Sequence, residues 1–525
     1  MLLKLIKLTI KGSFFKADKK NPTKVKSTLP MFAVLLAIIG VSYYAMYRET
    51  AELYLSMGAP VQYFQSLGSE LLLFLMLTDI SLVSSQLLES KYNDVLLTLP
   101  LKPSYITISR LLTSVLYGYG ITLAFGVPAL IAWSSVAGFS APLLVRGIVM
   151  MIFWRFIPLS IGVIVGYLFN KLTYRSKYKN LLKSFFTLAF IGVYYYFIFS
   201  STSSGNPDPN SGLSKILSKI ALLKWFAEGI YSGNLLYCGI IIVLAIVLMA
   251  IVMVFLNKVL YKSIISVKNS RKVTKTHTSF ARKPVIISLI RKELKHILNS
   301  YIYLTNNAIS LLFMIAAIVF AVINKDEIQY LMKLDMFEPI AVSLAIGALC
   351  MLCSTYVVSS CSISIEGKNI DALKSMPLES QTILESKLLF HYIFPGIIML
   401  VGSVLVGILF EIKPMLFVSL ILLPQLYLVV TDMAGLYFNL VFPKMDWANE
   451  EAVVKRGISV LLSMLTGMAL IGLAVGAYFL FLDEYLEVEV YLLVVAGVLL
   501  LLAVGLYFLL MTNGVKRFEK IHKGV

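Results

Sequence analysis

The sequence has few charged residues. Asp, Glu, Lys and Arg make up only 14% of its 525 residues, whereas about a quarter is usual in soluble domains. Hydrophobic residues make up 59%, and the mean hydropathy is +0.85. This balance excludes a soluble globular protein and indicates a protein embedded in a membrane.

Motifs of catalytic and nucleotide-binding sites are also lacking. The sequence contains no GxxxxGK[ST] phosphate-binding loop, since its one Gly-Lys pair, Gly367-Lys368, has Ser362 where the first glycine belongs. There is no HExxH, no Cys/His cluster with zinc spacing and no credible nucleophile–base set. We therefore expect no enzymatic activity, no metal site and no cofactor in this chain.

Cysteine is scarce. The four cysteines, Cys238, Cys350, Cys353 and Cys361, all lie in or beside long apolar runs. Cys350 and Cys353 form a CxxC, but within an apolar helix such residues are more often small packing residues than redox groups or metal ligands. We expect no disulfide framework.

Long apolar runs, in contrast, are abundant. A bilayer core needs about 20 apolar residues per helix, and twelve runs are candidates. The sequence predicts an all-α polytopic membrane protein with about 12 transmembrane helices. The runs lie near 31–47, 71–88, 111–134, 143–169, 184–200, 234–257, 306–324, 339–361, 388–410, 414–442, 457–482 and 490–511.

The basic residues are distributed unevenly between these runs. If the N-terminus is cytoplasmic and twelve spans alternate, the cytoplasmic segments hold 37 of the 46 Lys and Arg residues. This positive-inside bias predicts a multi-pass protein of the cell membrane with both termini in the cytoplasm. The net charge of +18 then reflects orientation and contact with membrane lipids, and we expect no nucleic-acid partner.

A polar stretch occurs twice between apolar runs. Residues 89–112 read ESKYNDVLLTLPLKPSYITISRLL, and residues 366–389 read EGKNIDALKSMPLESQTILESKLL. Aligned without a gap, the two share ten identical residues, and Arg110 faces Lys387. Each copy follows the second span of a six-span half, which indicates two pseudo-symmetric halves. We expect a first half at 1–262, a basic cytoplasmic linker at 263–283 and a second half at 284–525.

Each copy of the repeat is predicted to form a short helix, a break at proline and a return into the membrane. Carboxylates suit the start of such a helix, and a leucine is expected to project away from the membrane. The protrusion suits docking into a cytoplasmic partner with two equivalent grooves. The candidate docking residues are Glu89, Lys91, Asp94, Leu96 and Pro100 in the first copy, and Glu366, Lys368, Asp371, Leu373 and Pro377 in the second.

Basic amphipathic helices are expected just before the first span of each half. Apolar residues recur at helical spacing in 1–16 and in 284–300, with Lys and Arg on other faces. Both segments are typical of helices that lie on the inner leaflet. A simple membrane anchor is the alternative interpretation.

These features together resemble the permease subunits of ABC-2 type exporters, with both six-span halves fused in one chain. The resemblance implies connecting helices at 1–16 and 284–300 and cytoplasmic coupling helices at 89–105 and 366–382. It also implies a short outer helix between the fifth and sixth spans, for which 213–231 is the candidate. The corresponding loop of the second half, 483–489, departs from this pattern because it is short.

The same resemblance implies a function and a partner. The chain would move a peptide, lipid or amphiphilic drug-like substrate out of the cytoplasm. ATP and Mg²⁺ would be bound by a separate ABC ATPase subunit, in two copies, which engages the coupling helices. The sequence itself does not identify the substrate.

Three charged residues, Asp79, Arg155 and Asp432, fall within predicted spans. An ionised group there costs about 2.5–3.5 kcal/mol on insertion scales, so such residues usually face the interior of a bundle. Arg155 and Asp432 both lie in fourth spans and can pair with each other; otherwise Arg155 reaches a surface or pairs locally. We expect His391, at the start of span nine, to be structural.

Two other classes of protein were weighed. A secondary transporter of the major facilitator type also has twelve spans in two parallel halves, but its loop between spans two and three is usually short, with a GxxxDRxGRR pattern that is missing here. A membrane enzyme acting on lipid-linked substrates would need acidic or His clusters on one membrane face, and the sequence has none.

Overall fold

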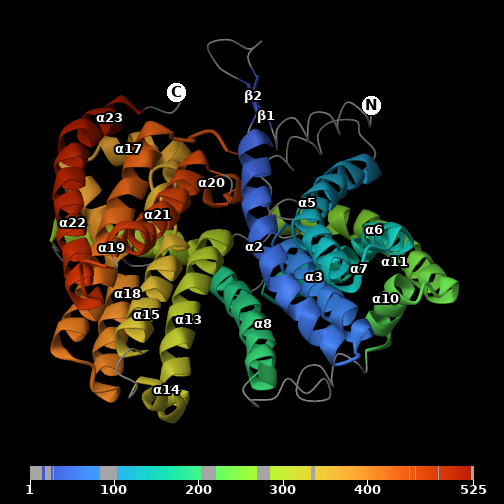
Figure 1. Ribbon diagram of the computed structural model, residues 1–525. Coiled ribbons are helices and arrows are strands. Elements are labelled where there is room, and N and C mark those ends of the chain that lie inside the picture. Colours follow the sequence, from blue (N-terminus) through green and yellow to red (C-terminus); the bar gives the residue numbers. More distant parts are fainter. Residues whose placement is uncertain are drawn as a thin grey trace. The chain divides into compact units, whose positions relative to one another are not determined.

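The computed structural model describes residues 15–17, 25–27, 29–82, 103–173, 176, 178–202, 220–268, 284–332, 337–447, 450–455, 457–482 and 484–521 (Figure 1). Within these ranges the regular structure is helical, apart from an antiparallel ribbon of β1 (Phe15–Ala17) and β2 (Val25–Ser27). The all-α class predicted from the sequence is confirmed.

The chain divides into two compact units. Unit 1 comprises Met1–Lys179 and Ala189–Lys275, and unit 2 comprises Asn180–Leu188 and Thr276–Val525. The division after Lys275 falls inside the predicted linker. Two differences from the predicted halves are that 180–188 belong to unit 2, and that α11, which ends at Lys268, includes the first residues of the predicted linker.

Unit 1 is built around a core rich in aromatic residues. α3 contacts α7 and α10, while α2 lies along α5. Tyr63, Phe64 and Trp133 pack together, and the ring of Trp154 lies 4.3 Å from that of Phe226. Its helices are α2 (Leu29–Ser56), α3 (Pro60–Leu82), α5 (Pro103–Ala137), α6 (Ala141–Trp154), α7 (Phe156–Thr173), α10 (Ala221–Tyr231) and α11 (Leu235–Lys268), with α8 (Lys179–Thr202) shared between the units.

Unit 2 is organised around α19, which contacts α15, α16, α18, α21 and α22. Figure 1 shows these longer helices running beside one another. The elements of the unit are α12 (Val285–Asn299), α13 (Tyr301–Ile323), α14 (Lys325–Met332), α15 (Phe337–Ser354), α16 (Val358–Cys361), η2 (Ser364–Asn369), α17 (Ile370–Lys374), α18 (Ser380–Leu409), α19 (Pro414–Val441), α20 (Glu451–Val454), α21 (Ile458–Ala477), η3 (Tyr478–Leu482), α22 (Val488–Leu509), η4 (Leu510–Gly514) and α23 (Val515–Lys520).

Nine helical segments in the described part of the chain are long and apolar enough to cross a membrane. They coincide with nine of the twelve predicted runs. The other three runs, near 31–47, 71–88 and 184–200, fall on α2, α3 and α8, of which only part is fully described. The predicted run at 339–361 is not one continuous helix, because α15 ends at Ser354 and α16 begins at Val358.

Helix positions follow the spacing of the polar repeat. The repeat copies are 277 residues apart, and the same interval separates the first residue of α3 from that of α15. It also separates the first residue of α5 from that of α18. The second and third spans of the two predicted halves therefore begin at matching positions, as an internal duplication would require.

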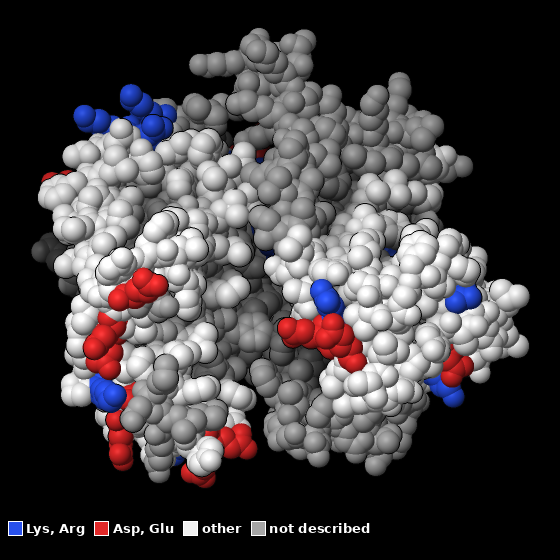
Figure 2. All heavy atoms as spheres, in the orientation of Figure 1, with Lys and Arg blue, Asp and Glu red and all other residues white. Residues whose placement is uncertain are grey.

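Charged residues on unit 2 are sorted between its ends. Figure 2 shows a group of Lys and Arg atoms near α23, and mainly Asp and Glu atoms, with some Lys or Arg atoms among them, towards the end where α14 lies. The basic residues of α23 include Arg517 and Lys520, and α14 begins with Asp326 and Glu327 in its first turn. This polarity fits a unit whose two ends lie on opposite sides of a membrane.

Candidate functional site

The second copy of the repeat lies at the α23 end of unit 2. It folds as η2 and α17, continues through Pro377, and enters α18 at Ser380. This is the expected order of short helix, proline break and return into a span. In the first copy, residues 89–102, with Glu89, Lys91, Asp94, Leu96 and Pro100, lie outside the described residues, and residues 103–112 form the start of α5.

Asn439, on α19, holds the start of this segment. Its Oδ1 accepts hydrogen bonds from the backbone N–H groups of Ile363, at 2.8 Å, and Ser364, at 3.0 Å. Its Nδ2 donates to the hydroxyls of Ser364 and Ser459. One fully buried amide thus satisfies four polar groups where the chain leaves α16.

Gly367 makes the turn inside this segment. Its φ of +52° lies in the left-handed region, and a Cβ at this position would lie 3.0 Å from the indole Nε1 of Trp447. That indole N–H donates to the carbonyl of Ser364 at 2.8 Å. Gly367 belongs to the Gly-Lys pair that does not fit a phosphate-binding loop. Its lack of a side chain allows the backbone to approach Trp447 closely.

A buried ionic network ties the segment to two helices. Lys387 of α18 donates to Oε1 of Glu293 at 2.7 Å, to Oε1 of Glu366 at 3.1 Å and to the carbonyl of Ser362 at 3.1 Å. Lys292 of α12 also pairs with Glu366. Lys387, Glu293 and Glu366 are each at most 3% exposed. Two carboxylates and two ammonium groups balance, which is what allows the charges to be buried.

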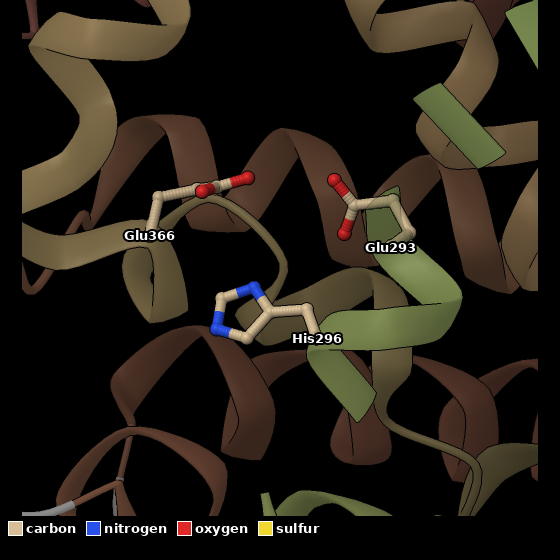
Figure 3. Close-up of side chains that lie close together, drawn as sticks. All are labelled: Glu293, His296 and Glu366. Atoms are coloured by element: carbon tan, nitrogen blue, oxygen red, sulfur yellow. The ribbon is translucent and has the colours of Figure 1, made fainter. Parts of the chain in front are cut away.

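The imidazole of His296 completes this cluster. Figure 3 shows Glu293 and His296, both from α12, and Glu366 from η2 facing a common space. One donor atom from each of the three lies within 4.8 Å of the others, a spacing that could hold a metal ion. The two lysines already neutralise both carboxylates, so a divalent cation would leave a net charge of about +2 in a buried site. The cluster is therefore better suited to ion pairing than to metal binding.

The orientation of the predicted docking residues is in part opposite to expectation. Asp371 and Pro377 are exposed, as docking would require. Glu366 and Leu373 are buried, so neither projects away from the unit. Leu373 packs with Phe518 of α23 and Ile383 of α18 because its segment lies flat on the helix ends. Lys368 is on η2, and its side chain lies outside what is described.

The amphipathic segment at 284–300 forms α12, which begins after Pro284. Leu289, Glu293 and Ile297 are its buried residues and face the rest of unit 2. The apolar stripe predicted from the spacing of Ile286, Ile290, Leu294 and Leu298 is adjacent to this face, and Ile286 itself is exposed. The matching N-terminal segment, 1–16, lies almost wholly outside the described residues.

The predicted outer helix at 213–231 is present in its second part as α10. Leu223, Phe226 and Ile230 are fully buried in the core of unit 1. α10 is therefore a packed element of this unit rather than a helix that only rests on a surface. Residues 213–219 lie outside the described residues.

Arg155 does not pair with Asp432, the partner considered from the sequence. Arg155 donates to both carboxylate oxygens of Asp79, at 2.6 and 2.8 Å, and to the carbonyl of Ser114 at 2.7 Å. Both charged residues are at most 1% exposed. Arg155 therefore pairs locally within unit 1, not with Asp432, because α3 brings Asp79 beside the junction of α6 and α7.

Asp432 lies on α19 of unit 2 and is 4% exposed. The hydroxyl of Ser359 hydrogen-bonds to its carboxyl group. Its Oδ2 has no hydrogen-bond partner, and among the described residues no Lys, Arg or His forms an ion pair with it. Asp432 thus differs from Asp79 in lacking a cationic partner in the described part of the chain.

Several residues of the site were not predicted from the sequence. Glu293 stands among basic residues of α12, Asn439 near the end of an apolar run, and Trp447 in a polar turn. The alignment of Arg110 with Lys387 was the one signal that marked position 387 as a conserved cation of the repeat. A single acid in a basic helix, such as Glu293, and an amide near the end of a span, such as Asn439, are weaker signals of a buried polar site.

Comparison with known proteins gives the family but no relative of known activity. No curated protein matches the chain. A family model described as membrane protein of 12 TMs matches residues 27–511, which is most of the sequence and includes all twelve predicted runs. The chain therefore belongs to this family of twelve-span membrane proteins.

Proposed function

We propose that the chain is the transmembrane permease subunit of an ATP-driven exporter of the ABC-2 type. It moves a peptide, lipid or amphiphilic drug-like substrate out of the cytoplasm, and a separate ATPase subunit, in two copies, engages its two coupling segments. The protein lies in the cell membrane with both termini in the cytoplasm. The polar repeat and the resemblance described above are the basis of this proposal.

The observation that carries the proposal is the attachment of segment 366–382 to a span. Lys387 joins Glu366 of the segment and Glu293 of α12 to the first turns of α18. A displacement of the segment therefore displaces α18, because the buried charges cannot separate without leaving a carboxylate unpaired. Such a rigid connection suits transmission of force from a cytoplasmic motor.

The source of energy follows from the sequence. Without a phosphate-binding loop, this chain has no P-loop site for ATP, so ATP and Mg²⁺ belong to the ATPase subunit. The exposed side of the segment, with Asp371 and Pro377, is the surface offered to that subunit. The basic end of unit 2, near α23, would face the cytoplasm (Figure 2).

The test uses the protein purified with its ATPase from native membranes. Asp371→Lys reverses an exposed charge on the segment, so we expect loss of the ATPase subunit and of ATP-driven substrate export, with the chain still folded as judged by its melting transition. Glu366 is unsuited to this test, since reversing its charge would disrupt the buried network. The matched control is Glu484→Lys, an exposed acid at the other end of unit 2. Full ATP-driven export by Asp371→Lys would contradict the proposed docking role.

A second candidate function is a twelve-span secondary transporter of the major facilitator type, driven by an ion gradient. One observation favours it: Asp432 is a buried acid within a span and has no cationic partner among the described residues. Acids in this setting often belong to ion pathways. Transport by the purified chain on an ion gradient, with no nucleotide hydrolysed, would select this candidate over the exporter.

A further inference from the structure

Two pairs of residues occupy equivalent positions in the two units. Asp79 and Arg155 form the ion pair of unit 1. At the interval of the polar repeat, 277 residues further along, stand Tyr356 and Asp432. Tyr356 and Asp432 lie close enough to interact electrostatically. The correspondence in sequence is thus matched by proximity within unit 2.

The two pairs differ in charge. In unit 1 a guanidinium neutralises a carboxylate through two hydrogen bonds. In unit 2 the acid of the pair is replaced by a neutral phenol, and the cation is replaced by an acid. The second half therefore has a buried carboxyl group at the place where the first half has its cation. An ionised carboxylate buried without a cation is strongly disfavoured, and such a group usually binds a proton instead.

The surroundings of Asp432 are tightly packed and rich in hydroxyl groups. Tyr356 belongs to the break between α15 and α16, and Ser359 to α16. Gly435, one turn after Asp432, leaves room for hydroxyls: a Cβ there would lie 2.7 Å from Oγ of Ser359 and 2.9 Å from Oγ of Ser463. Hydroxyl groups can accept or donate but cannot neutralise a carboxylate.

The other titratable groups of the neighbouring elements do not supply a cation. α15 contributes Cys350 and Cys353, both buried thiols, and α16 contributes Cys361. α21 contains no Asp, Glu, Lys, Arg or His. On α18, Lys387 is bound by Glu293 and Glu366.

His391 of α18 and the titratable residues of α22 also lie on elements that contact α19. Both ring nitrogens of His391, on α18, lack a hydrogen-bond partner among the described residues, and His391 is not within ion-pair distance of Asp432. α22 carries Glu489 and Tyr491 near its start and Tyr507 near its end; Tyr491 donates to the carbonyl of Ala474, and Tyr507 to Glu385. No positive charge on α15, α16, α18, α21 or α22 is therefore available to Asp432.

We propose that Asp432 is a reversible proton-binding site, occupied by a proton in the conformation described here. A proton satisfies Asp432 without further ligands, whereas a metal ion needs several converging ligands, and the candidate metal cluster found among the described residues, Glu293, His296 and Glu366, does not include Asp432. The break between α15 and α16 places irregular backbone beside the acid, as in membrane proteins where such breaks border an ion pathway. The proposal is independent of whether an ATPase drives transport.

The first test is infrared spectroscopy of the purified chain in lipid nanodiscs at neutral pH. We expect the carbonyl band of a protonated carboxylic acid to be reduced in Asp432→Asn relative to the wild type. Asp371→Asn is the control, because Asp371 is exposed to solvent and its replacement should leave the band unchanged. An undiminished band in Asp432→Asn would overturn the proposal.

The second test does not depend on the folding of a variant. The wild-type chain, prepared with isotope-labelled aspartate, should show a labelled protonated-carboxyl band that persists at pH values where exposed aspartates are ionised. Absence of that band would overturn the proposal.

A third measurement compares the melting temperature in sodium chloride with that in choline chloride of equal ionic strength. A sodium-dependent rise that Asp432→Asn abolishes would show a metal-cation site in place of a proton site.

Discussion

At the scale of single residues, the most informative side chain of unit 2 is Lys387. All three of its ammonium hydrogens have acceptors, and two of these are buried carboxylates. Buried ion pairs contribute little net stability over an apolar core, yet removal of one partner is costly. We infer that this network fixes geometry rather than adding to stability.

Lys387→Met tests the role of this ammonium. The substitution leaves the carboxylates of Glu293 and Glu366 buried with one lysine between them, so we expect a loss of about 3–5 kcal/mol in the free energy of unfolding. Thermal unfolding in detergent, followed by tryptophan fluorescence, measures the effect. Lys295→Met is the control: Lys295 is an exposed residue of the same helix, α12, that forms no ion pair with the described residues, and its loss should cost about 0.5 kcal/mol or less.

Neutralising the two carboxylates should reverse most of the effect of Lys387→Met. Adding Glu293→Gln and Glu366→Gln to Lys387→Met removes the uncompensated charges, and much of the lost stability should return. A Lys387→Met variant no less stable than Lys295→Met would show that the network is not the buried, balanced cluster described.

Gly118 provides a test of the ion pair in unit 1. A Cβ at this position would overlap Nε and Cζ of Arg155. Gly118→Ala should therefore displace the guanidinium from Asp79 and lower the melting temperature, with an overpacking cost of about 1–3 kcal/mol. Gly239→Ala is the matched control in α11, because a Cβ there meets no atom within 4 Å. Equal stability of the two variants would contradict the close approach of Arg155 to α5.

At the scale of elements, α12 packs against the rest of unit 2 through its buried residues, and its expected role at the membrane surface is a separate one. Its position before the first span of the second half is predictable from apolar spacing, and the helix is present. Which of its faces contacts protein was not predictable, because Leu289 and Ile297 lie beside the expected stripe rather than on it. Periodicity identifies a face but not the partner that covers it.

Leu289→Ala separates these two roles. Leu289 is 6% exposed and belongs to one apolar cluster with Ile370 and Leu373 of the coupling segment. Its truncation should cost about 2–5 kcal/mol and loosen the segment. Ile287→Ala removes a similar apolar area from a residue that is 52% exposed, so it should change stability by about 0.5 kcal/mol or less. Proteolytic sensitivity of the segment and thermal unfolding both report the difference; equal effects would indicate a surface anchor alone.

The sequence predicted the spans far better than their interruptions. Apolar length is a local property, so long runs such as 388–410 and 414–442 correspond to α18 and α19. The break at Thr355–Val357 has no proline or glycine to announce it; it is held by distant groups, such as Asn307, whose Oδ1 accepts from the N–H of Val357 at 3.2 Å. The partner of Arg155 was missed for the same reason, since pairing depends on which helices pack together.

At the scale of the whole molecule, orientation in the membrane connects the charge pattern to the proposed function. Lys374 of α17 donates to the carbonyl of Ile521 at 2.8 Å and lies over the ring of Phe518. The coupling segment and α23 are therefore on the same side of unit 2. A label on α23 reports the side of the membrane on which the segment lies.

Cysteine labelling decides this orientation. In a background without the four natural cysteines, we expect Glu484→Cys to react with a membrane-impermeant maleimide in intact cells, since residue 484 lies in a predicted outer loop. Lys516→Cys, on α23, should react only after the cells are permeabilised, because basic segments remain in the cytoplasm. Both positions are exposed, so accessibility within the fold does not bias the comparison. Labelling of Lys516→Cys from outside would place the coupling segment beyond reach of any cytoplasmic ATPase and remove the physical basis of the exporter proposal.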